Sequence, residues 1–390
     1  MSKTPNLRFK EFSGDYKKTQ FSDCVSIKNG QVNPCIEPYC DMPHIGPGNM
    51  EKFTGRLLDV RTAKEDGQMS GKYLFDKDDI LYGKINPQFG KVVFPKYEGL
   101  CSADTYPLKA LKGMVSGYLF YSLQTSRFLK YSISVSMRTG MPKINREELS
   151  LYNFNLPKTE EQEKIASFFS LIDDKICLQS EKVEVLKDYK TGMMQKIFSR
   201  ELRFKDDDGR DYPEWEEKKI KDIFTVTRGV VIAKNEISDL MDNINQYPVY
   251  SSQTSNNGIL GYDSKYDFEG DYLTWTTDGA NAGKVFRRNG KFRCTNVCGV
   301  LVEKEETLGF ANKMISEILN KETPKHVSYV GNPKLMNGVM GDIKIKVPIL
   351  DEQIKIAKVL DSIDLKIEKE QEKLDSLKQY KKGLLQQMFV

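Results

Sequence analysis

The chain contains the same 59-residue segment twice, 191 residues apart. Residues 140–198 align without a gap onto residues 331–389, and 22 of the 59 positions are identical. The stretch EEQEKIASFFSLIDDKI of the first copy returns as DEQIKIAKVLDSIDLKI in the second. Unrelated sequences match at only about one position in twenty, so the segment is an internal duplication.

Each copy is predicted to form one long helix, over residues 157–200 and 347–390. Apolar residues recur every three, four or seven positions, which gathers them into one stripe on a helix. The stripe comprises Ile165, Phe169, Ile172, Ile176, Val183, Leu186, Met193 and Ile197 in the first copy, and Ile356, Leu360, Ile363, Ile367, Leu374, Leu377, Leu384 and Met388 in the second. About 40 helical residues span about 60 Å. A charged helix of that length must bury its stripe against a similar partner, and the sister copy is the nearest candidate. Two unrelated surface helices on separate domains are the alternative.

The duplication extends beyond the helices. The tetrapeptide LRFK at residues 7–10 returns at residues 202–205, directly after the first helix. The chain is therefore two halves of the same order, related by an approximate twofold axis. In such an arrangement the two helices run antiparallel and the chain termini come close together.

Two globular stretches separate the repeated elements. Both contain short β-type runs, turn signals and helical patches, which is typical of α+β domains, although they share little sequence outside their ends. The sequence thus predicts a first domain at 1–156, a first helix at 157–200, a linker and second domain at 201–346, and a second helix at 347–390. A chain of 390 residues accommodates this division.

Composition excludes several classes of protein. No apolar run of about 18 residues occurs and the N-terminus has no apolar signal core, so we expect a cytoplasmic protein. The chain has seven cysteines and two histidines but no CxxC pair, which favours free thiols in a reducing cytosol over a structural zinc site.

Catalytic motifs are also missing. No Walker A loop occurs, and His44 and His326 lack the context of a nucleophilic site. NPQF at residues 86–89 resembles the loop of adenine amino-methyltransferases, but no glycine-rich cofactor loop accompanies it, so a turn between strands is the better interpretation. We expect no catalytic residue, cofactor or metal in this chain.

Several polar stretches are suited to DNA. KVFRRNGKFR at 284–293 has five basic residues and no acid, which predicts a one-sided basic stripe on a strand pair, with a solvated hairpin as the alternative. The loops at 251–258 and 276–283 carry amides and hydroxyls that can reach base edges. The Gly-x-Pro-Lys turns at 140–143 and 331–334 repeat in both halves, and are either basic contacts to a shared ligand or structural turns. The candidate DNA-binding residues are Lys84, Asn86, Gln88, Arg138, Lys143, Ser252, Gln253, Thr254, Asn256, Thr276, Thr277, Asn281, Lys284, Arg287, Arg288 and Lys334.

The whole pattern resembles the specificity subunit of type I restriction–modification systems. The resemblance rests on the helix openings LPKTEEQEKIASFFSLIDDKI and VPILDEQIKIAKVLDSIDLKI, the tails LKDYKTGMMQKIF and LKQYKKGLLQQMF, the LRF segments, and the run YPVYSSQTSNNGILGY with DYLTWTTDGANAG. It covers nearly the whole chain and is least specific in the first globular stretch.

The resemblance implies a non-catalytic protein with two α+β target-recognition domains joined by a long antiparallel two-helix coiled coil. Each domain would bind one half of a bipartite, asymmetric DNA sequence, and the coiled coil would set their spacing. Two methyltransferase subunits would dock on the scaffold, motor-nuclease subunits would join the complex, and S-adenosylmethionine, ATP and magnesium would belong to those partners. A coiled-coil adaptor that does not bind DNA and a single-chain DNA methyltransferase are the alternatives.

Overall fold

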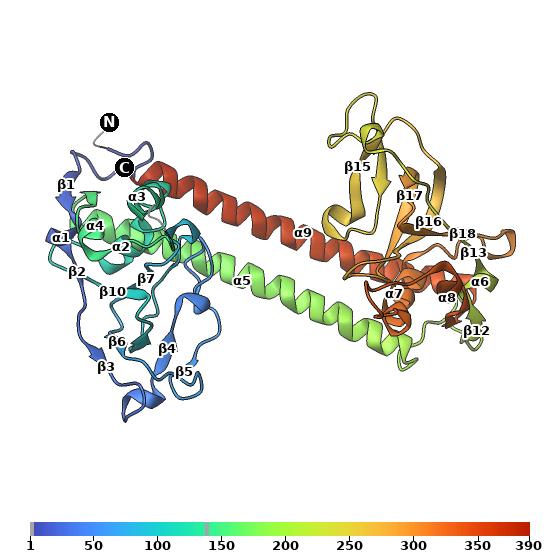
Figure 1. Cartoon of the computed structure of the whole chain (residues 1–390), viewed down its shortest axis with the longest axis horizontal. Helices are drawn as coiled ribbons and strands as arrows, with labels where there is room; N and C mark the ends of the chain where they lie inside the picture. Colours follow the sequence, from blue (N-terminus) through green and yellow to red (C-terminus); the bar gives the residue numbers. More distant parts are fainter. Residues whose placement is uncertain (1–3, 137–139) are drawn as a thin grey trace. The chain divides into compact units, whose positions relative to one another are not determined.

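The chain divides into two compact units. The computed structural model describes residues 4–136 and 140–390. Unit 1 comprises Met1–Glu181 with Gln371–Val390, and unit 2 comprises Lys182–Glu370. The two predicted helices are present as α5 (Thr159–Phe198) and α9 (Leu350–Met388) (Figure 1), so each unit contains one end of each helix.

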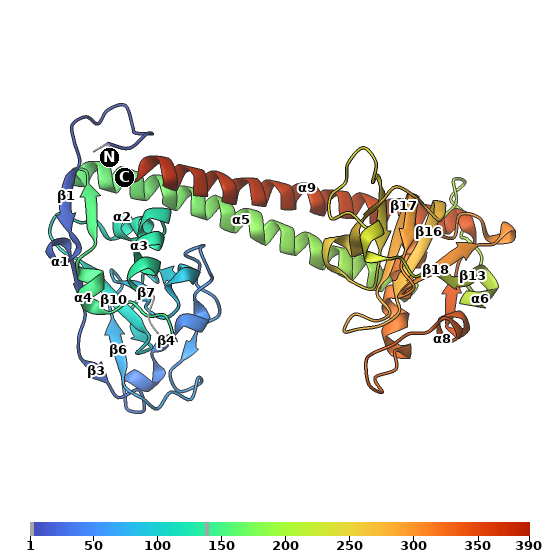
Figure 2. The ribbon, with the colours of Figure 1, turned by 45° about the horizontal axis from the view of Figure 1, so that its top comes forward.

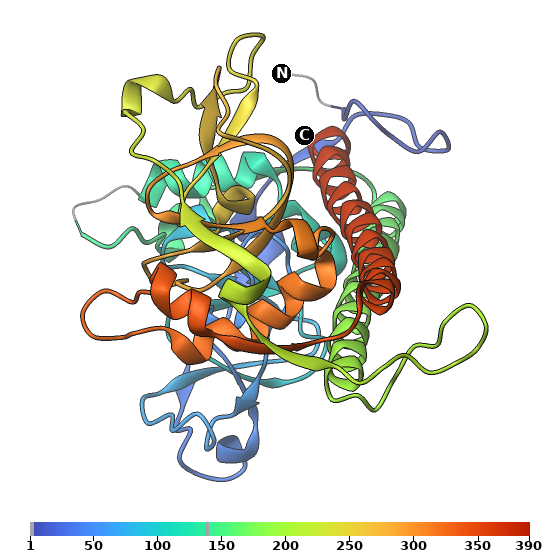
Figure 3. The same cartoon turned by 90° about the vertical axis from the view of Figure 1, so that its right-hand side faces the viewer.

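The ends of α5 and α9 pack against each other within each unit. In unit 1, Phe169 near the start of α5 lies in one core with Leu384 and Met388 near the end of α9. In unit 2, Ile197 at the end of α5 lies in one core with Ile356 near the start of α9. The order of these contacts is antiparallel, as the repeat predicts, and the paired segments are visible in Figures 1 and 3.

The N-terminal segment lies beside the end of α9 in unit 1. The backbone N–H of Leu7 donates to the carbonyl of Gln387 at 3.0 Å. Arg8 donates twice to Glu161 of α5, from Nε and from Nη2, both at 2.8 Å. The prediction that the two ends of the chain come together is confirmed for the described residues.

Unit 1 is an α+β assembly of two main sheets (Figure 1). One sheet has the order β2-β10-β7-β8, the other has the order β3-β6-β9-β4-β5, and β1 pairs with β11. The strands are β1 (Lys17–Gln20), β2 (Val25–Ile27), β3 (Gln31–Val32), β4 (Pro43–Ile45), β5 (Arg61–Thr62), β6 (Lys72–Phe75), β7 (Ile80–Gly83), β8 (Val92–Val93), β9 (Gly99–Cys101), β10 (Thr105–Ala110) and β11 (Asn153–Leu156). The helices are α1 (Phe21–Cys24), α2 (Ser116–Ser122), α3 (Ser126–Ser136) and α4 (Arg146–Ser150), with short 3-10 turns η1 (Tyr39–Asp41), η2 (Pro47–Asn49) and η3 (Pro87–Phe89).

Unit 2 is built around one six-stranded sheet, of order β13-β18-β16-β17-β14-β15 (Figure 2), and β12 pairs with β19. The strands are β12 (Glu216–Lys219), β13 (Phe224–Arg228), β14 (Tyr247–Tyr250), β15 (Ile259–Asp263), β16 (Phe268–Thr276), β17 (Val285–Cys294), β18 (Cys298–Glu303) and β19 (Lys344–Val347). The helices are α6 (Ile220–Ile223), α7 (Lys313–Glu322) and α8 (Asn337–Asp342), with 3-10 turns η4 (Lys234–Glu236), η5 (Ser255–Gly258), η6 (Glu305–Thr307) and η7 (Thr323–His326).

The two globules share their topology despite their different sequences. In unit 1, β10 pairs antiparallel with β2 and β7, and β4 runs parallel to β9. In unit 2, β18 pairs antiparallel with β13 and β16, and β14 runs parallel to β17. The long strands β16 and β17 of unit 2 occupy the positions that shorter pieces, β6 with β7 and β8 with β9, occupy in unit 1. The duplication therefore includes the globules as well as the helices.

No helix in the described part of the chain is both long enough and apolar enough to span a bilayer.

Candidate nucleic-acid interface

In unit 1 a loop and a turn that are far apart in the sequence lie against each other. The loop is residues 84–90, between β7 and β8, and the turn is residues 140–144, before α4. The backbone N–H of Asn86 donates to the carbonyl of Pro142 at 2.8 Å, and that of Ile144 donates to the carbonyl of Lys84 at 3.1 Å. We call this arrangement the loop–turn junction of unit 1.

Unit 2 contains the same junction, formed by residues 277–283, between β16 and β17, and residues 331–335. The N–H of Gly279 donates to the carbonyl of Pro333 at 2.9 Å, and that of Leu335 donates to the carbonyl of Thr277 at 2.8 Å. Each partner is the repeat of its counterpart in unit 1, with the loops offset by 193 residues and the turns by 191. The two loops are thus equivalent, which the sequences alone do not suggest.

The ends of both loops have the same backbone structure. The N–H of Gly83 donates to the carbonyl of Lys91 at 2.9 Å, and the N–H of Thr276 donates to the carbonyl of Lys284 at 3.0 Å. The residue before each lysine is a glycine with positive φ, 52° at Gly90 and 87° at Gly283. Glycine is the residue that adopts this left-handed conformation at little cost. Gly-Lys is the one dipeptide that the two loops have in common.

The junction of unit 1 places two lysines close together. Burial lowers the pKa of Lys84, and the positive charge of Lys143 lowers it further. Lys143 is exposed at the turn. In the loop, the amide of Gln88 donates to Oδ1 of Asn86 at 3.3 Å. Because like charges destabilise each other, an anion bound here would relieve the repulsion between the two ammonium groups.

In unit 2, two further segments are bonded to the loop of the junction: residues 251–258 and the turn between β17 and β18. The side-chain amide of Asn281 donates to Thr254 Oγ1 at 3.0 Å, which ties residues 277–283 to residues 251–258. The hydroxyls of Ser252 and Thr277 both donate to the carbonyl of Val297, in the turn between β17 and β18. These bonds fix the loops into one polar surface that carries hydroxyl, amide and lysine side chains.

The candidate residues differ in their exposure. Those exposed are Lys143, Asn256, Asn281, Lys284, Arg287 and Lys334. Those half-buried are Lys84, Asn86, Gln88, Ser252, Gln253 and Thr254. Thr276, Thr277 and Arg288 are buried, with exposed fractions of 1%, 7% and 2%. Arg138 lies outside the described residues. The buried threonines hold the loops with their hydroxyls, so they are not available to a ligand.

The prediction of a one-sided basic stripe at 284–293 is wrong. Arg288 is covered by Tyr250, with its guanidinium carbon 3.6 Å from the ring centroid, and it donates to the carbonyl of Asn257 at 2.8 Å. Arg293 is buried against Asp263 at 2.5 Å. Strand alternation assigns faces but does not reveal which face a distant loop covers. Here the loop after β14 covers the face on which Arg288 lies.

Arg287 and Lys291 lie on the opposite face of β17, and each has a carboxylate close to its charged group. Arg287 is within 3.5 Å of both Asp271 and Asp361, and Lys291 is 3.7 Å from Glu269. Of the basic side chains in the run, Lys284 at the loop–turn junction remains exposed without a carboxylate partner within 4.0 Å among the described residues.

Arg288→Ala should lower the free energy of unfolding of unit 2 by about 2 kcal/mol, because it removes a desolvated cation–π contact and the hydrogen bonds to Asn257 and Thr274. Arg287→Ala is the matched control and should cost less than about 1 kcal/mol, since its ion pairs are exposed. Both tryptophans, Trp215 and Trp275, are in unit 2, so urea unfolding followed by tryptophan fluorescence measures this difference. If both variants lose the same free energy of unfolding, the buried contacts of Arg288 do not stabilise unit 2 more than the exposed ion pairs of Arg287 do.

Two further exposed residues at the unit 2 surface are not among the candidates predicted from the sequence. Asn296 is exposed in the turn whose neighbouring carbonyl binds Ser252 and Thr277. Tyr329 is 70% exposed beside the Gly-x-Pro-Lys turn. The signal for Asn296 is its position between Cys294 and Cys298, at a strand-to-strand turn. For Tyr329 the signal is its place two residues before the repeated glycine.

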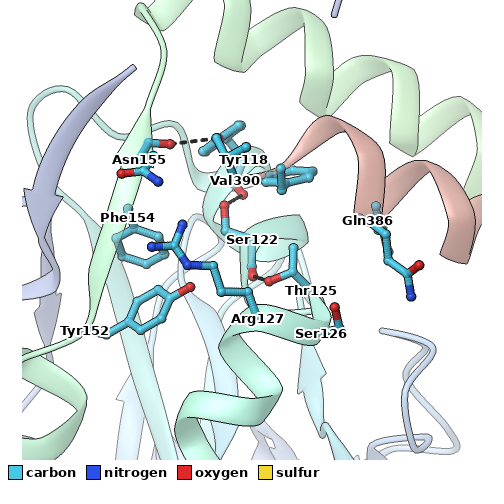
Figure 4. A pocket seen from close by; sticks show the side chains of 12 residues that line it. Tyr118, Ser122, Thr125, Ser126, Arg127, Tyr152, Phe154, Asn155, Gln386 and Val390 are labelled. Atoms are coloured by element: carbon cyan, nitrogen blue, oxygen red, sulfur yellow. Dashed lines mark hydrogen bonds between the residues drawn. The ribbon is translucent and has the colours of Figure 1, made fainter. Parts of the chain in front are cut away.

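Unit 1 also contains two cavities. A small one, of about 110 Å³, lies between α2, β11 and the end of α9 (Figure 4). Two hydroxyls of its lining bind backbone carbonyls of the lining, since Tyr118 donates to Asn155 at 3.4 Å and Ser122 donates to Tyr118 at 2.7 Å. A larger one, of about 1010 Å³, lies between residues 51–57, α2 and both long helices. Neither cavity is lined by the candidate residues.

Within residues 4–136 and 140–390, no group of three or more His, Cys, Asp or Glu side chains could hold a metal ion.

The chain matches the family model of the type I restriction modification DNA specificity domain twice, at residues 14–188 and 212–379. It belongs to the type I restriction–modification specificity family. The two matches cover both globules and most of both long helices, in agreement with the duplicated fold.

Relatives in this specificity family are found in Mycoplasma pneumoniae. One, described as the N-terminus of a type I specificity subunit, is 44% identical over 145 residues, which is 37% of this chain and 75% of that protein. Another type I specificity subunit is 33% identical over 226 residues, 56% of this chain and 78% of that protein.

Two solved structures share the fold. The S subunit of a type I restriction–modification system from M. genitalium superposes with a TM-score of 0.61, at 17% identity over 99% of both chains. A chain from a type I restriction–modification assembly has a TM-score of 0.58, at 14% identity over 95% of this chain and 96% of that chain. At these identities the likeness is one of fold.

Proposed function

We propose that this chain is the DNA-reading subunit of a type I restriction–modification complex, and that each unit binds one half of a bipartite, asymmetric site. The observation that carries the proposal is the loop–turn junction, which recurs in both units with different side chains. A common backbone presents Lys84, Asn86 and Gln88 in unit 1, and Asn281 and Lys284 in unit 2. Two unlike reading surfaces on one framework suit a site with two unlike halves.

The side chains at the junctions have the chemistry of base and backbone contacts. Amides of asparagine and glutamine can bind the adenine edge with two hydrogen bonds, and lysines can contact phosphates or guanine. Lys143 and Lys334, on the repeated turns, are both exposed beside these amides. Ser252, Gln253, Thr254 and Asn256 belong to the proposed surface of unit 2. Thr276, Thr277 and Arg288 hold its loops through hydrogen bonds to backbone carbonyls.

We further propose that α5 and α9 form an antiparallel coiled coil that sets the distance between the half-sites. Two repeat-related ion pairs support this. Lys190 of α5 lies 2.7 Å from Asp364 of α9 in unit 2, and Lys381 of α9 lies 2.7 Å from Asp173 of α5 in unit 1. Helices of this length reach about 60 Å, and half-sites on one face of DNA are about 34 Å apart per turn.

The same helices are proposed to hold two copies of a methyltransferase subunit. Tyr189 and Tyr380 are repeat-related, and both are exposed, at 54% and 58%. Twofold-related positions offer equivalent contacts to two copies of one partner. Motor-nuclease subunits would join through that complex. Catalysis, with S-adenosylmethionine, ATP and magnesium, would then reside in the partner subunits, and this chain would be non-catalytic.

Lys284→Ala with Lys334→Ala should reduce the salt slope of DNA binding by about 2, because each phosphate contact contributes about 0.9 to that slope. The measurement is DNA affinity against salt concentration, for the full chain assembled with its methyltransferase subunits. The probe is a duplex pool selected by the wild-type complex from a randomised library.

Lys221→Ala with Lys344→Ala is the matched control in unit 2. These exposed lysines pair with Asp342 and Glu217, and we expect no change in slope. An unchanged slope in the Lys284 and Lys334 variant would remove this junction from the DNA interface. Failure of the wild-type complex to select any sequence would refute the proposed function.

A further inference from the structure

A short turn beside the unit 2 junction exposes two adjacent apolar side chains. Tyr329 is 70% exposed and Val330 is 93% exposed, the largest exposed fraction of any large apolar side chain among the described residues. They lie at the tip of residues 328–334, which connect η7 to α8. Single exposed apolar residues are common on protein surfaces, but an adjacent exposed pair on one turn indicates a binding surface.

The tip is held firmly by the residues at its base. Ser328 and Lys334 exchange two backbone hydrogen bonds, at 2.8 and 2.9 Å. Leu335 directly after the turn is fully buried, and its carbonyl accepts a hydrogen bond from Trp275 Nε1 at 3.0 Å. The turn is thereby fixed to the core of unit 2, so little conformational entropy would be lost when the tip enters a binding partner.

The surroundings of the tip favour a polyanion as that partner. Lys334 at its base is exposed, and so is Lys284, which directly follows the loop that pairs with the turn. His326, also exposed, precedes the tip. Proteins that place apolar groups against bases bind the neighbouring phosphates with basic side chains, and Lys334 at the base of this tip is suited to that role.

We propose that Tyr329 and Val330 insert into a groove of the half-site bound by unit 2 and contact its bases. The inference rests on the proposed function and adds to it two residues that contribute to sequence selectivity without hydrogen bonds. The repeat makes the point specific to unit 2. At the corresponding positions, 191 residues earlier, the first half has Arg138 and Thr139, so its turn has no apolar pair before the glycine.

The test is a Tyr329→Ser/Val330→Ser double variant of the full chain, assembled with its methyltransferase subunits. Affinity is measured over a range of salt concentrations for two probes, the duplex pool selected by the wild-type complex and the unselected starting pool. We expect affinity for the selected pool to fall about tenfold or more, with an unchanged salt slope and unchanged affinity for the starting pool. Tyr329→Phe/Val330→Ile, which keeps the apolar character, should remain within about threefold of wild type.

Leu308→Ser is the matched control, since Leu308 is a 63% exposed apolar residue of unit 2. Its neighbour Thr307 donates a hydrogen bond to the carbonyl of Ile223. The Leu308→Ser variant should leave both affinities unchanged. Unchanged affinity of the serine double variant for the selected pool would overturn the inference. So would an equal loss for both pools with a shallower slope, which indicates backbone contact, or a loss of methyltransferase binding, which indicates a protein contact. If the wild-type complex selects no sequence, the proposed function itself fails, and this inference fails with it.

Discussion

Four residues inserted after Glu181 in α5, together with four after Glu372 in α9, should weaken binding to the original DNA site by about 100-fold or more. Each helix grows by about 6 Å, or about two base-pair steps, so the two units no longer reach both half-sites at once. The two positions are repeat-related, and the insertion leaves the ion pairs Lys190–Asp364 and Lys381–Asp173 each within its own unit. Selection from a randomised library should then return the same half-sequences, separated by a gap about two base pairs longer.

Two controls distinguish spacing from general damage. Four residues inserted in the exposed turn at 206–209, outside both helices, should leave the selected gap unchanged. Insertion in α5 alone offsets its stripe against that of α9, and should lower stability as well as binding. Altered bases within either half-sequence would contradict the proposed role of the helices as a spacer.

Lys381→Met should lower the free energy of unfolding of unit 1 by about 3 kcal/mol. Lys381 is 7% exposed, and it contacts Asp173 at 2.7 Å and Gln124 Oε1 at 3.1 Å. Burial lowers the pKa of this lysine, and Asp173 opposes the shift. Breaking a buried pair costs about 3–5 kcal/mol, and the lower end applies because the side chain of Asp173 is 31% exposed.

Lys190→Met is the matched substitution in unit 2, and should cost about 1 kcal/mol or less. Lys313 remains there, 2.6 Å from Asp364 and 2.8 Å from Glu317, so neither carboxylate loses its last cation. Urea unfolding followed by far-ultraviolet circular dichroism reports on both units, and tryptophan fluorescence reports on unit 2. Lys381→Met should shift the first signal and leave the second unchanged. Equal losses for the two variants would show that Lys313 does not compensate.

The internal repeat predicts the long helices well, because burial of a continuous apolar stripe depends on spacing alone. The sequence places helices at 157–200 and 347–390, and the structure has them at Thr159–Phe198 and Leu350–Met388. Repeat symmetry also predicts the antiparallel contacts. It does not predict that the globules share a topology, since matching strands in the two units retain few identical residues.

The candidate site is harder to predict from the sequence, because its geometry depends on loops that are far apart in the sequence and contact each other only in the folded chain. Alternation along β17 places Arg287 and Arg288 on opposite faces, but only the folded chain shows that Tyr250 covers one of them. Thr276 and Thr277 look like surface hydroxyls in a polar loop, and the structure uses both to bind backbone carbonyls. The turns that carry Lys143 and Lys334 repeat in the sequence, and the structure places both lysines exposed at the two junctions, while their role as DNA contacts stays a prediction.

The loop–turn junctions are joined through main-chain atoms, from Asn86 to Pro142 in one unit and from Gly279 to Pro333 in the other. These hydrogen bonds do not depend on the side chains of the residues that form them. Substitutions at the outward positions of these loops can therefore accumulate while folding is preserved. Under the proposed function, a few point changes at these positions would give a new target preference while the fold of each unit is kept.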